Sequence, residues 1–220
     1  MPKIDFRLNA LVDMDNLGAD KLVDYAAIAA RSGATLIQYR DKNSPTRLMV
    51  ERARAIHAAL AGTGVPLLVN DRVDVALAAG VEGVHIGRDD MLPADARRLL
   101  GPDRIIGVTV KNEADAAAAM NADVDYACIG GVFATLSKNN PDAPVGIDGF
   151  RHLASLIRTA KPGLPIGAIA GIDLETTPQV MQAGADGVAV ISAIFRADDP
   201  AEATRLLRKA VDKALKERQS

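Results

Sequence analysis

Short apolar runs of strand length alternate along the chain with longer segments that carry a helical period. The runs lie at 8–12, 35–39, 66–70, 83–87, 104–108, 126–131, 165–170 and 187–192. Most of them are continuously apolar, which is typical of strands buried on both faces of a parallel sheet. The pattern therefore predicts a parallel sheet of eight strands.

The segments between these runs predict helices. In 19–33, Leu22, Tyr25, Ala26 and Ala29 follow the i, i+3, i+4, i+7 spacing of one helix face. Further helices are expected at 44–64, 91–101, 112–123, 146–163, 173–186 and 199–220, with a short one at 72–80. Strand and helix thus alternate through the whole chain.

This alternation leaves two architectures open, a closed barrel or an open doubly wound sheet. No linker or change of composition divides the chain, so one domain spanning 1–220 is expected. Eight strands favour the closed (β/α)8 TIM barrel, in which the active site lies at the carboxyl ends of the strands.

Charged residues follow several of the expected strands directly. Arg40 and Lys42 come after the second strand, Asp71 after the third, Asp90 after the fourth and Lys138 after the sixth. Two carboxylates on one rim repel each other unless a cation lies between them, and Mg²⁺ commonly uses one or two carboxylates together with phosphate oxygens. Arg and Lys side chains hold phosphate charge as well. The rim therefore predicts a diphosphate held between Mg²⁺ and basic side chains.

A second anion site is expected beside the last two strands. The segment "AGI" follows the seventh strand, and "IS" ends the eighth, so backbone N–H groups and the Ser192 hydroxyl are available. Loops at this place are a recurrent phosphate site in such barrels. The mouth is therefore expected to accept two phosphorylated ligands.

Each of these residues also has an ordinary structural interpretation. Arg40 and Asp41 fit a surface ion pair. Asp71 and Asp90 fit the first positions of helices, and His85 fits a packed, hydrogen-bonded side chain. Their joint placement on one rim favours the functional interpretation.

Composition narrows the class of protein further. The net charge of −2 argues against a general surface for nucleic acid or anionic membranes. Cys128 is the only cysteine, so no intrachain disulfide can form, and no apolar run reaches the length of about 20 residues that a membrane helix needs. We expect a cytoplasmic protein whose partners are small molecules, and an assembly of identical chains is left open.

At this point six segments resemble the thiamine-phosphate synthase family, also called thiamine-phosphate pyrophosphorylase. They are "QYRDK", "VNDRVDVALAAGVEGVHIGRDD", "IIGVTV", "IGGVFATLSK", "AIAGI" and "GADGVAVISAI", in order from about residue 34 to residue 196. The resemblance implies a (β/α)8 barrel. It also implies a Mg²⁺-dependent transferase that couples 4-amino-2-methyl-5-(diphosphooxymethyl)pyrimidine with 4-methyl-5-(2-phosphooxyethyl)thiazole to give thiamine phosphate and diphosphate.

The resemblance also assigns residues. It implies Asp71 and Asp90 as metal ligands. The substrate-binding set is Gln38, Tyr39, Arg40, Asp41, Lys42, Asn70, Thr109, Thr135, Leu136, Ser137, Lys138, Gly171, Ile191 and Ser192. We expect Arg40, Lys42 and Lys138 to be catalytic, stabilising the departing diphosphate while the thiazole nitrogen attacks the methylene cation that remains. Such catalysis needs positioning and electrostatics rather than a strong base.

The sequence departs from the family pattern at several positions. Arg88 replaces a usual Gln, Thr109 replaces a usual Ser, and "GGVFATLSK" replaces "GPxxPTxTK". "AIAGI" replaces "GIGGI", so Ala168 and Ala170 carry methyl groups where the pattern has glycine. The hydroxyl at 109 is retained, and Arg88 adds a cation near the expected metal carboxylates.

Three other functions are left open. A related thiazole tautomerase would need an acid or base at the mouth, for which Lys111 is the nearest ionisable residue to the end of the fifth strand. A phosphate-handling epimerase or aldolase would use Asp71 or Lys138. A non-catalytic protein would bind thiazole phosphate or thiamine phosphate without turnover.

Overall fold

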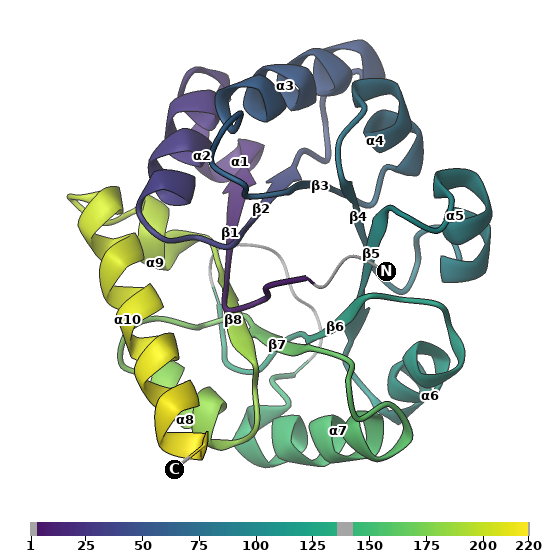
Figure 1. The fold of residues 1–220 in the computed structure, drawn as a ribbon, viewed down its shortest axis with the longest axis vertical. Coiled ribbons are helices and arrows are strands. Elements are labelled where there is room, and N and C mark those ends of the chain that lie inside the picture. Colours follow the sequence, from purple (N-terminus) through teal and green to yellow (C-terminus); the bar gives the residue numbers. More distant parts are fainter. Residues whose placement is uncertain (1–3, 136–142, 220) are drawn as a thin grey trace.

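The computed structural model describes residues 4–135 and 143–219 as eight parallel strands surrounded by helices (Figure 1). The strands close into a barrel in the order of the sequence, and β1 pairs with β8. They are β1 (Leu8–Asp13), β2 (Leu36–Arg40), β3 (Leu67–Asn70), β4 (Gly83–Ile86), β5 (Ile105–Val110), β6 (Tyr126–Ile129), β7 (Ile166–Ile169) and β8 (Gly187–Val190). The predicted (β/α)8 barrel is confirmed.

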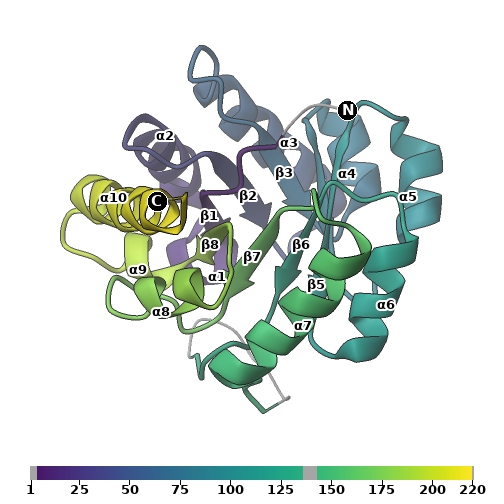
Figure 2. The same ribbon diagram turned by 60° about the horizontal axis from the view of Figure 1, so that its bottom comes forward.

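The helices form the outer layer of the barrel (Figures 1 and 2). They are α1 (Met14–Leu17), the 3-10 helix η1 (Ala19–Lys21), α2 (Leu22–Arg31), α3 (Thr46–Ala59), α4 (Val73–Ala79), α5 (Pro93–Leu100), α6 (Glu113–Asn121), α7 (Gly146–Ala160), α8 (Thr177–Gln182), α9 (Ser192–Phe195) and α10 (Pro200–Gln219). Every predicted helix is present, but α1, η1 and α9 were not predicted. The helix expected over 173–186 is shorter, because Asp173 accepts hydrogen bonds from the amides of Glu175 and Thr176 and forms a turn.

The two faces of each strand explain the continuous apolar runs. Ile37 and Tyr39 of β2 face outward and pack in the large core beneath the helices, whereas Leu36 belongs to a smaller cluster inside the barrel. Side chains alternate along a strand, so Gln38 and Arg40 share the inward face with Leu36. The polar residues of β2 are therefore directed inward toward the carboxyl end.

An aromatic side chain fills the amino end of the barrel. The segment before β1 crosses the barrel centre (Figure 1), and the Phe6 ring lies 4.6 Å from the Tyr126 ring between centroids. A Cβ atom on Gly167 would lie only 1.9 Å from the Phe6 ring, so β7 needs glycine there. This packing closes the end of the barrel opposite to the predicted mouth.

In the described part of the chain, no helix has both the length and the apolar character needed to span a membrane.

Candidate active site

The two predicted metal carboxylates converge at the carboxyl ends of β3 and β4. The amide of Asp71 donates to the His85 carbonyl at 2.7 Å, which fixes the start of the loop after β3 against β4. Asp90 Oδ2 accepts from the Gly87 amide at 2.8 Å. Burial, and next the hydrogen bond with Asp90, raise the pKa of Asp71 to about 6, while Lys42 lowers it. The structure thus brings the carboxyl groups of Asp71 and Asp90 close enough to interact.

The two described basic residues of the rim pair with carboxylates. Lys42 Nζ forms an ion pair with Asp71 Oδ2. The Arg40 guanidinium is hydrogen-bonded to Asp13 Oδ2, and Asp15 lies 3.7 Å from the same nitrogen. Asp13 is fully buried at the end of β1 and was missed in the sequence. The signal was available, because Asp13 follows its apolar run as Asp71 follows its own.

The side chains of Tyr39 and Asp41 are directed away from the mouth. The Tyr39 hydroxyl donates to Asp41 Oδ2 at 2.8 Å, and Arg52 forms an ion pair with the same oxygen at 2.8 Å. Burial raises the pKa of Asp41, but hydrogen bonds from Ser44 and Tyr39 outweigh it, so that the pKa is lowered. Asp41 is therefore bonded beneath α3 and does not form the surface pair with Arg40 that was weighed as an alternative.

Three further predicted residues bring polar side chains to neighbouring strands of the barrel. Gln38 is 2% exposed on the inward face of β2. Asn70, half-buried at the end of β3, is in register with His85 of β4. Thr109 of β5 has its hydroxyl 2.8 Å from His85 Nε2. The strands β2 to β5 thus supply uncharged polar groups beside the two carboxylates.

The loops after β6, β7 and β8 also meet. Thr135, Gly171, Ile191 and Ser192 line one small hollow of about 20 Å³, which is the place of the predicted second anion site. A volume of this size admits a group about as large as one water molecule. Four residues predicted to bind the same phosphate therefore lie together.

The backbone at this hollow is conformationally restricted. Gly171 has φ of 65°, and a Cβ atom there would lie 2.6 Å from the Ala134 carbonyl oxygen and 2.6 Å from Phe133 Cβ. Ala170 has φ of 86°, a region that residues with a side chain seldom occupy. The turn after β7 is therefore held close to the loop after β6.

The structure shows where the Arg88 side chain lies, whereas three of the expected site residues are not among the residues that it describes. Leu136, Ser137 and Lys138 lie outside the described residues. Arg88 is half-exposed and hydrogen-bonds to Asp115 of α6 at 3.2 Å from Nε and 3.1 Å from a terminal nitrogen. The Arg88 guanidinium is thus directed to α6, and Asp90 keeps its contacts with Asp71 and Gly87.

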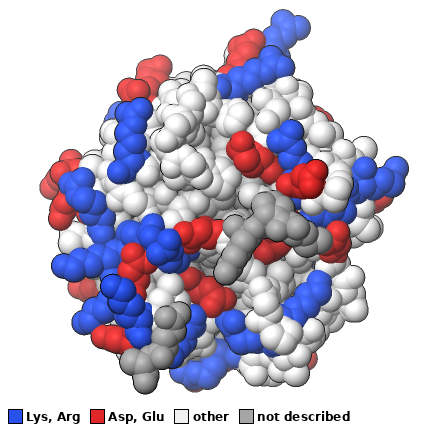
Figure 3. Space-filling model, in the orientation of Figure 1, with Lys and Arg blue, Asp and Glu red and all other residues white. Residues whose placement is uncertain are grey.

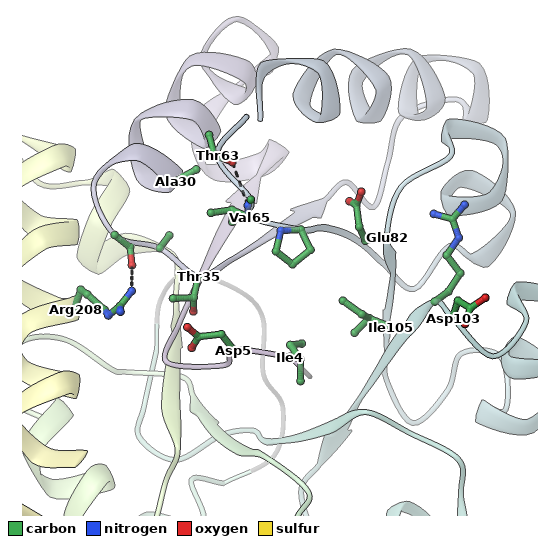
Figure 4. Close-up of a pocket in the computed structure, with 15 residues that line it drawn as sticks. Ile4, Asp5, Ala30, Thr35, Thr63, Val65, Glu82, Asp103, Ile105 and Arg208 are labelled. Carbon is green, nitrogen blue, oxygen red and sulfur yellow. Dashed lines mark hydrogen bonds between the residues drawn. The ribbon is translucent and has the colours of Figure 1, made fainter. Parts of the chain in front are cut away.

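A wide hollow lies at the opposite end of the barrel (Figure 4). Its volume is about 850 Å³, and its charged side chains include Asp5, Glu82, Arg104 and Arg208. Arg208 donates to the Gly33 carbonyl at 2.9 Å, and Glu82 accepts from the Leu67 amide at 2.9 Å. These groups are bonded within the protein at the end where such barrels carry stability rather than catalysis.

Lys and Arg side chains are interspersed with Asp and Glu on the surface over α10 (Figure 3). Arg205, Arg208, Lys209, Lys213 and Lys216 line a groove there. Three of these five residues pair with carboxylates of the same helix, and the ion pairs with Glu202 and Glu217 are exposed. Exposed pairs of this kind are common on helices and weak, so this surface does not compete with the mouth as a site.

Comparisons with known proteins identify the family of the chain. A family model described as thiamine monophosphate synthase matches residues 8–194. The chain is 60% identical over 219 residues to the thiamine-phosphate synthase of Agrobacterium fabrum, covering 100% of both chains. It is 43% identical to that of Chloroflexus aurantiacus, covering 94% of each. The solved structure of thiamine phosphate pyrophosphorylase from Pyrococcus furiosus superposes with a TM-score of 0.85 at 33% identity, covering 97% of this chain and 98% of that one.

The resemblance seen in six segments thus extends over the length of the chain, and the fold agrees with it. The chain belongs to the thiamine monophosphate synthase family.

Proposed function

We propose that Asp71 and Asp90 bind Mg²⁺ and that the reaction of this family depends on that ion here. The chain is a transferase of thiamine biosynthesis. It couples the pyrimidine diphosphate with the thiazole phosphate and releases thiamine phosphate and diphosphate. The observation that carries the proposal is the contact between the two strand-end carboxylates beside Lys42.

The residues at the mouth fit Mg²⁺. Asp71 and Asp90 offer hard oxygen donors. Burial, and next the neighbouring Asp90, raise the pKa of Asp71, so a cation is the natural partner of the pair. Within residues 4–135 and 143–219, no metal site made of three or more His, Cys, Asp or Glu side chains is found, so a metal at the mouth would have only these two carboxylates as protein ligands of that kind. Two carboxylates suit Mg²⁺, which keeps several waters and takes its remaining oxygens from substrate phosphate. When bound, the ion supplies positive charge for the leaving diphosphate.

The basic side chains share the remaining diphosphate charge. Arg40 is held toward the mouth by Asp13, and Lys42 is bonded to Asp71 through a side chain that is 45% exposed. We assign Lys138 to the same group. As the bond between the methylene carbon and the diphosphate oxygen breaks, these cations stabilise the charge on that oxygen. The electron pair of the thiazole nitrogen then forms the new bond to the methylene carbon.

The two substrates occupy the two halves of the mouth. Gln38, Asn70 and Thr109 bind the pyrimidine diphosphate. Thr135, Gly171, Ile191 and Ser192, together with Leu136 and Ser137, bind the thiazole phosphate. Support for this division comes from the separate hollow that is lined by Thr135, Gly171, Ile191 and Ser192. Tyr39 and Asp41 support the site by fixing the end of β2 and do not contact substrate through their side chains.

Diphosphate release with both substrates, measured on matched Asp→Asn variants, tests the metal assignment. Asp90→Asn should lower kcat by about 10²-fold or more, the range known for loss of one preorganised electrostatic contact. The control is Asp89→Asn, because Asp89 is the exposed neighbour of Asp90. Normal turnover by Asp90→Asn, or an equal loss in both variants, would overturn the assignment.

Lys138→Ala tests the assigned cation in the same assay. A loss of about 10²-fold or more in kcat is expected, by the same comparison. The exposed Lys216 provides the control, since it lies on α10. A Lys138→Ala enzyme that turns over at nearly the normal rate would remove Lys138 from the mechanism.

A further inference from the structure

A chain of hydrogen bonds runs from β6 through β4 to β5 inside the barrel. The Tyr126 hydroxyl lies 2.8 Å from His85 Nδ1, and His85 Nε2 lies 2.8 Å from the Thr109 hydroxyl. Tyr126 is fully buried and His85 is 8% exposed, whereas Thr109 is half-buried near the carboxyl end of β5. The chain therefore begins in the closed interior and ends at the mouth.

Burial fixes the direction of the first hydrogen bond. Among the described residues, His85 is the only hydrogen-bond partner of the Tyr126 hydroxyl. Burial raises the pKa of Tyr126 well above its usual value, so the phenol keeps its proton. A buried O–H group without an acceptor costs about 1–3 kcal/mol. The phenol therefore donates to His85 Nδ1.

The direction of the second hydrogen bond follows from the first. A neutral imidazole whose Nδ1 accepts a hydrogen bond carries its proton on Nε2. His85 Nε2–H therefore donates to the Thr109 hydroxyl oxygen. The proton of that hydroxyl is then directed away from His85 and can be donated elsewhere.

We propose that Tyr126 fixes His85 in the Nε2–H tautomer and thereby makes the Thr109 hydroxyl a hydrogen-bond donor to the substrate. In this arrangement Thr109 contacts substrate, and His85 and Tyr126 are positioning residues. The acceptor is an oxygen or ring nitrogen of the pyrimidine diphosphate. That last step rests on the proposed function, which places Thr109 at this substrate.

Packing holds each member of the chain in place. The Tyr126 ring covers Gly107, where a Cβ atom would lie 1.9 Å from the ring, and it stacks on the His85 ring with centroids 5.5 Å apart. The Thr109 methyl group lies 3.2 Å from the position of a Cβ atom on Gly130. Gly130 thus leaves the room that this methyl group occupies, and a β-branched side chain has few χ1 rotamers, which limits the directions open to the Thr109 hydroxyl.

The tautomer can be measured without substrate. The chain has three histidines, so His57→Gln and His152→Gln together leave His85 as the only imidazole. Nitrogen-15 NMR above about pH 7.5, where an ordinary histidine is neutral, should show a protonated Nε2 and an unprotonated Nδ1. The Tyr126→Phe variant, which keeps the ring over Gly107, should show a mixture of tautomers. A protonated Nδ1 in the chain with Tyr126 intact would overturn the proposal.

Activity then tests the consequence for Thr109. Tyr126→Phe should lower kcat/KM for the pyrimidine diphosphate by about tenfold, which corresponds to one hydrogen bond of about 1.4 kcal/mol. The KM for the thiazole phosphate should not change. Thr109→Ser should keep most of the activity, and Thr109→Val should lose at least as much as Tyr126→Phe. An unchanged kcat/KM in Tyr126→Phe would refute the functional half of the proposal.

Two variants of His85 keep the test decisive if Tyr126→Phe does not fold. The amide of His85→Gln can accept from Tyr126 and donate to Thr109, whereas the thioether of His85→Met cannot donate. We expect His85→Gln to retain activity within about threefold and His85→Met to lose about tenfold. Equal losses in the two variants would contradict a donor chain. Absence of turnover in the unchanged enzyme would instead refute the proposed function and leave the tautomer measurement intact.

Discussion

At the scale of single residues, Asp71 combines three unusual properties. Its φ is 65°, its side chain is only 12% exposed, and it lies beside both Asp90 and Lys42. The raised pKa of about 6 means that the metal-free folded chain holds this proton more tightly than the unfolded chain. Asp71 therefore reduces the free energy of unfolding as pH rises from about 4 to about 6. Residues that oppose stability in this way are typical of functional sites.

The pKa of Asp71 predicts how Mg²⁺ binding depends on pH. Mg²⁺ needs the ionised carboxylate, so below pH 6 the ion must displace a proton. The Kd for Mg²⁺, measured by isothermal titration, should be nearly constant above about pH 7 and should rise by up to about tenfold per pH unit below about pH 6. Asp89→Asn should give the same curve. A Kd that does not change between about pH 5 and 8 would contradict the role of Asp71.

The direction of Asp41 and Tyr39 shows what could be predicted for single residues. The motif Gln38 to Lys42 was assigned to substrate as a block. Alternation along β2 directs Gln38 and Arg40 inward and Tyr39 outward, and this could have been predicted from the strand. The bond between Asp41 and Arg52 could not, because it depends on the place of α3 against the strand end.

At the scale of elements, every strand was predicted because burial on both faces makes most of the runs continuously apolar. The helices α1 and α9 were not predicted, since four residues are too few to show a helical period. Asp13 was missed although it follows its apolar run as Asp71 does; its side chain accepts from the Asn16 amide at the start of α1 and also holds Arg40. The contacts between the loops after β6, β7 and β8 at the small hollow depend on the backbone angles of those loops. A repeating pattern of apolar and polar residues does not predict such angles.

Two alanines of the β7 segment give a prediction at this scale. Ala170 has φ of 86°, where a side chain costs about 1–2 kcal/mol, so Ala170→Gly removes this penalty. The substitution also removes a buried methyl group and raises the conformational entropy of the unfolded chain, and both effects favour unfolding. Because these effects offset the relief of strain, the free energy of unfolding should either rise or change by less than about 0.5 kcal/mol. Ala168→Gly is the matched control, because Ala168 is fully buried in β7 and has no such strain. It should lower the free energy of unfolding by about 1–2 kcal/mol.

Urea unfolding of the two variants measures this difference directly. A loss for Ala170→Gly as large as that for Ala168→Gly would show that Ala170 is unstrained. In that case alanine at position 170 has no energetic cost, and the close approach of the turn after β7 to the loop after β6 does not strain the backbone.

At the scale of the whole molecule, the barrel is packed at one end and carries its chemistry at the other. Phe6 fills the amino end, and the carboxylates and cations lie at the carboxyl ends of the strands. In the larger hollow at the amino end, Arg208 and Glu82 are bonded to backbone groups of the protein. Stability and function are thus separated along the barrel axis, as is usual for this fold.

This separation predicts that Phe6→Ala lowers the free energy of unfolding strongly but changes kcat little. Phe6 is 3% exposed, and Phe→Ala in a core lowers the free energy of unfolding by about 3–5 kcal/mol. Leu92→Ala serves as the control, because Leu92 is 66% exposed and should change stability by less than about 0.5 kcal/mol. Urea unfolding gives both values, and diphosphate release by folded Phe6→Ala should keep a near-normal kcat. A small effect on stability would show that Phe6 does not fill the barrel.

The central claim is that a divalent ion held by Asp71 and Asp90 takes part in releasing diphosphate at the mouth. The most direct measurement is diphosphate release by the unchanged enzyme with both substrates, after removal of metal by a chelator and during titration with Mg²⁺. We predict negligible release without metal and full restoration by Mg²⁺, with neither result altered in Asp89→Asn. Full activity of the metal-free enzyme would contradict this account.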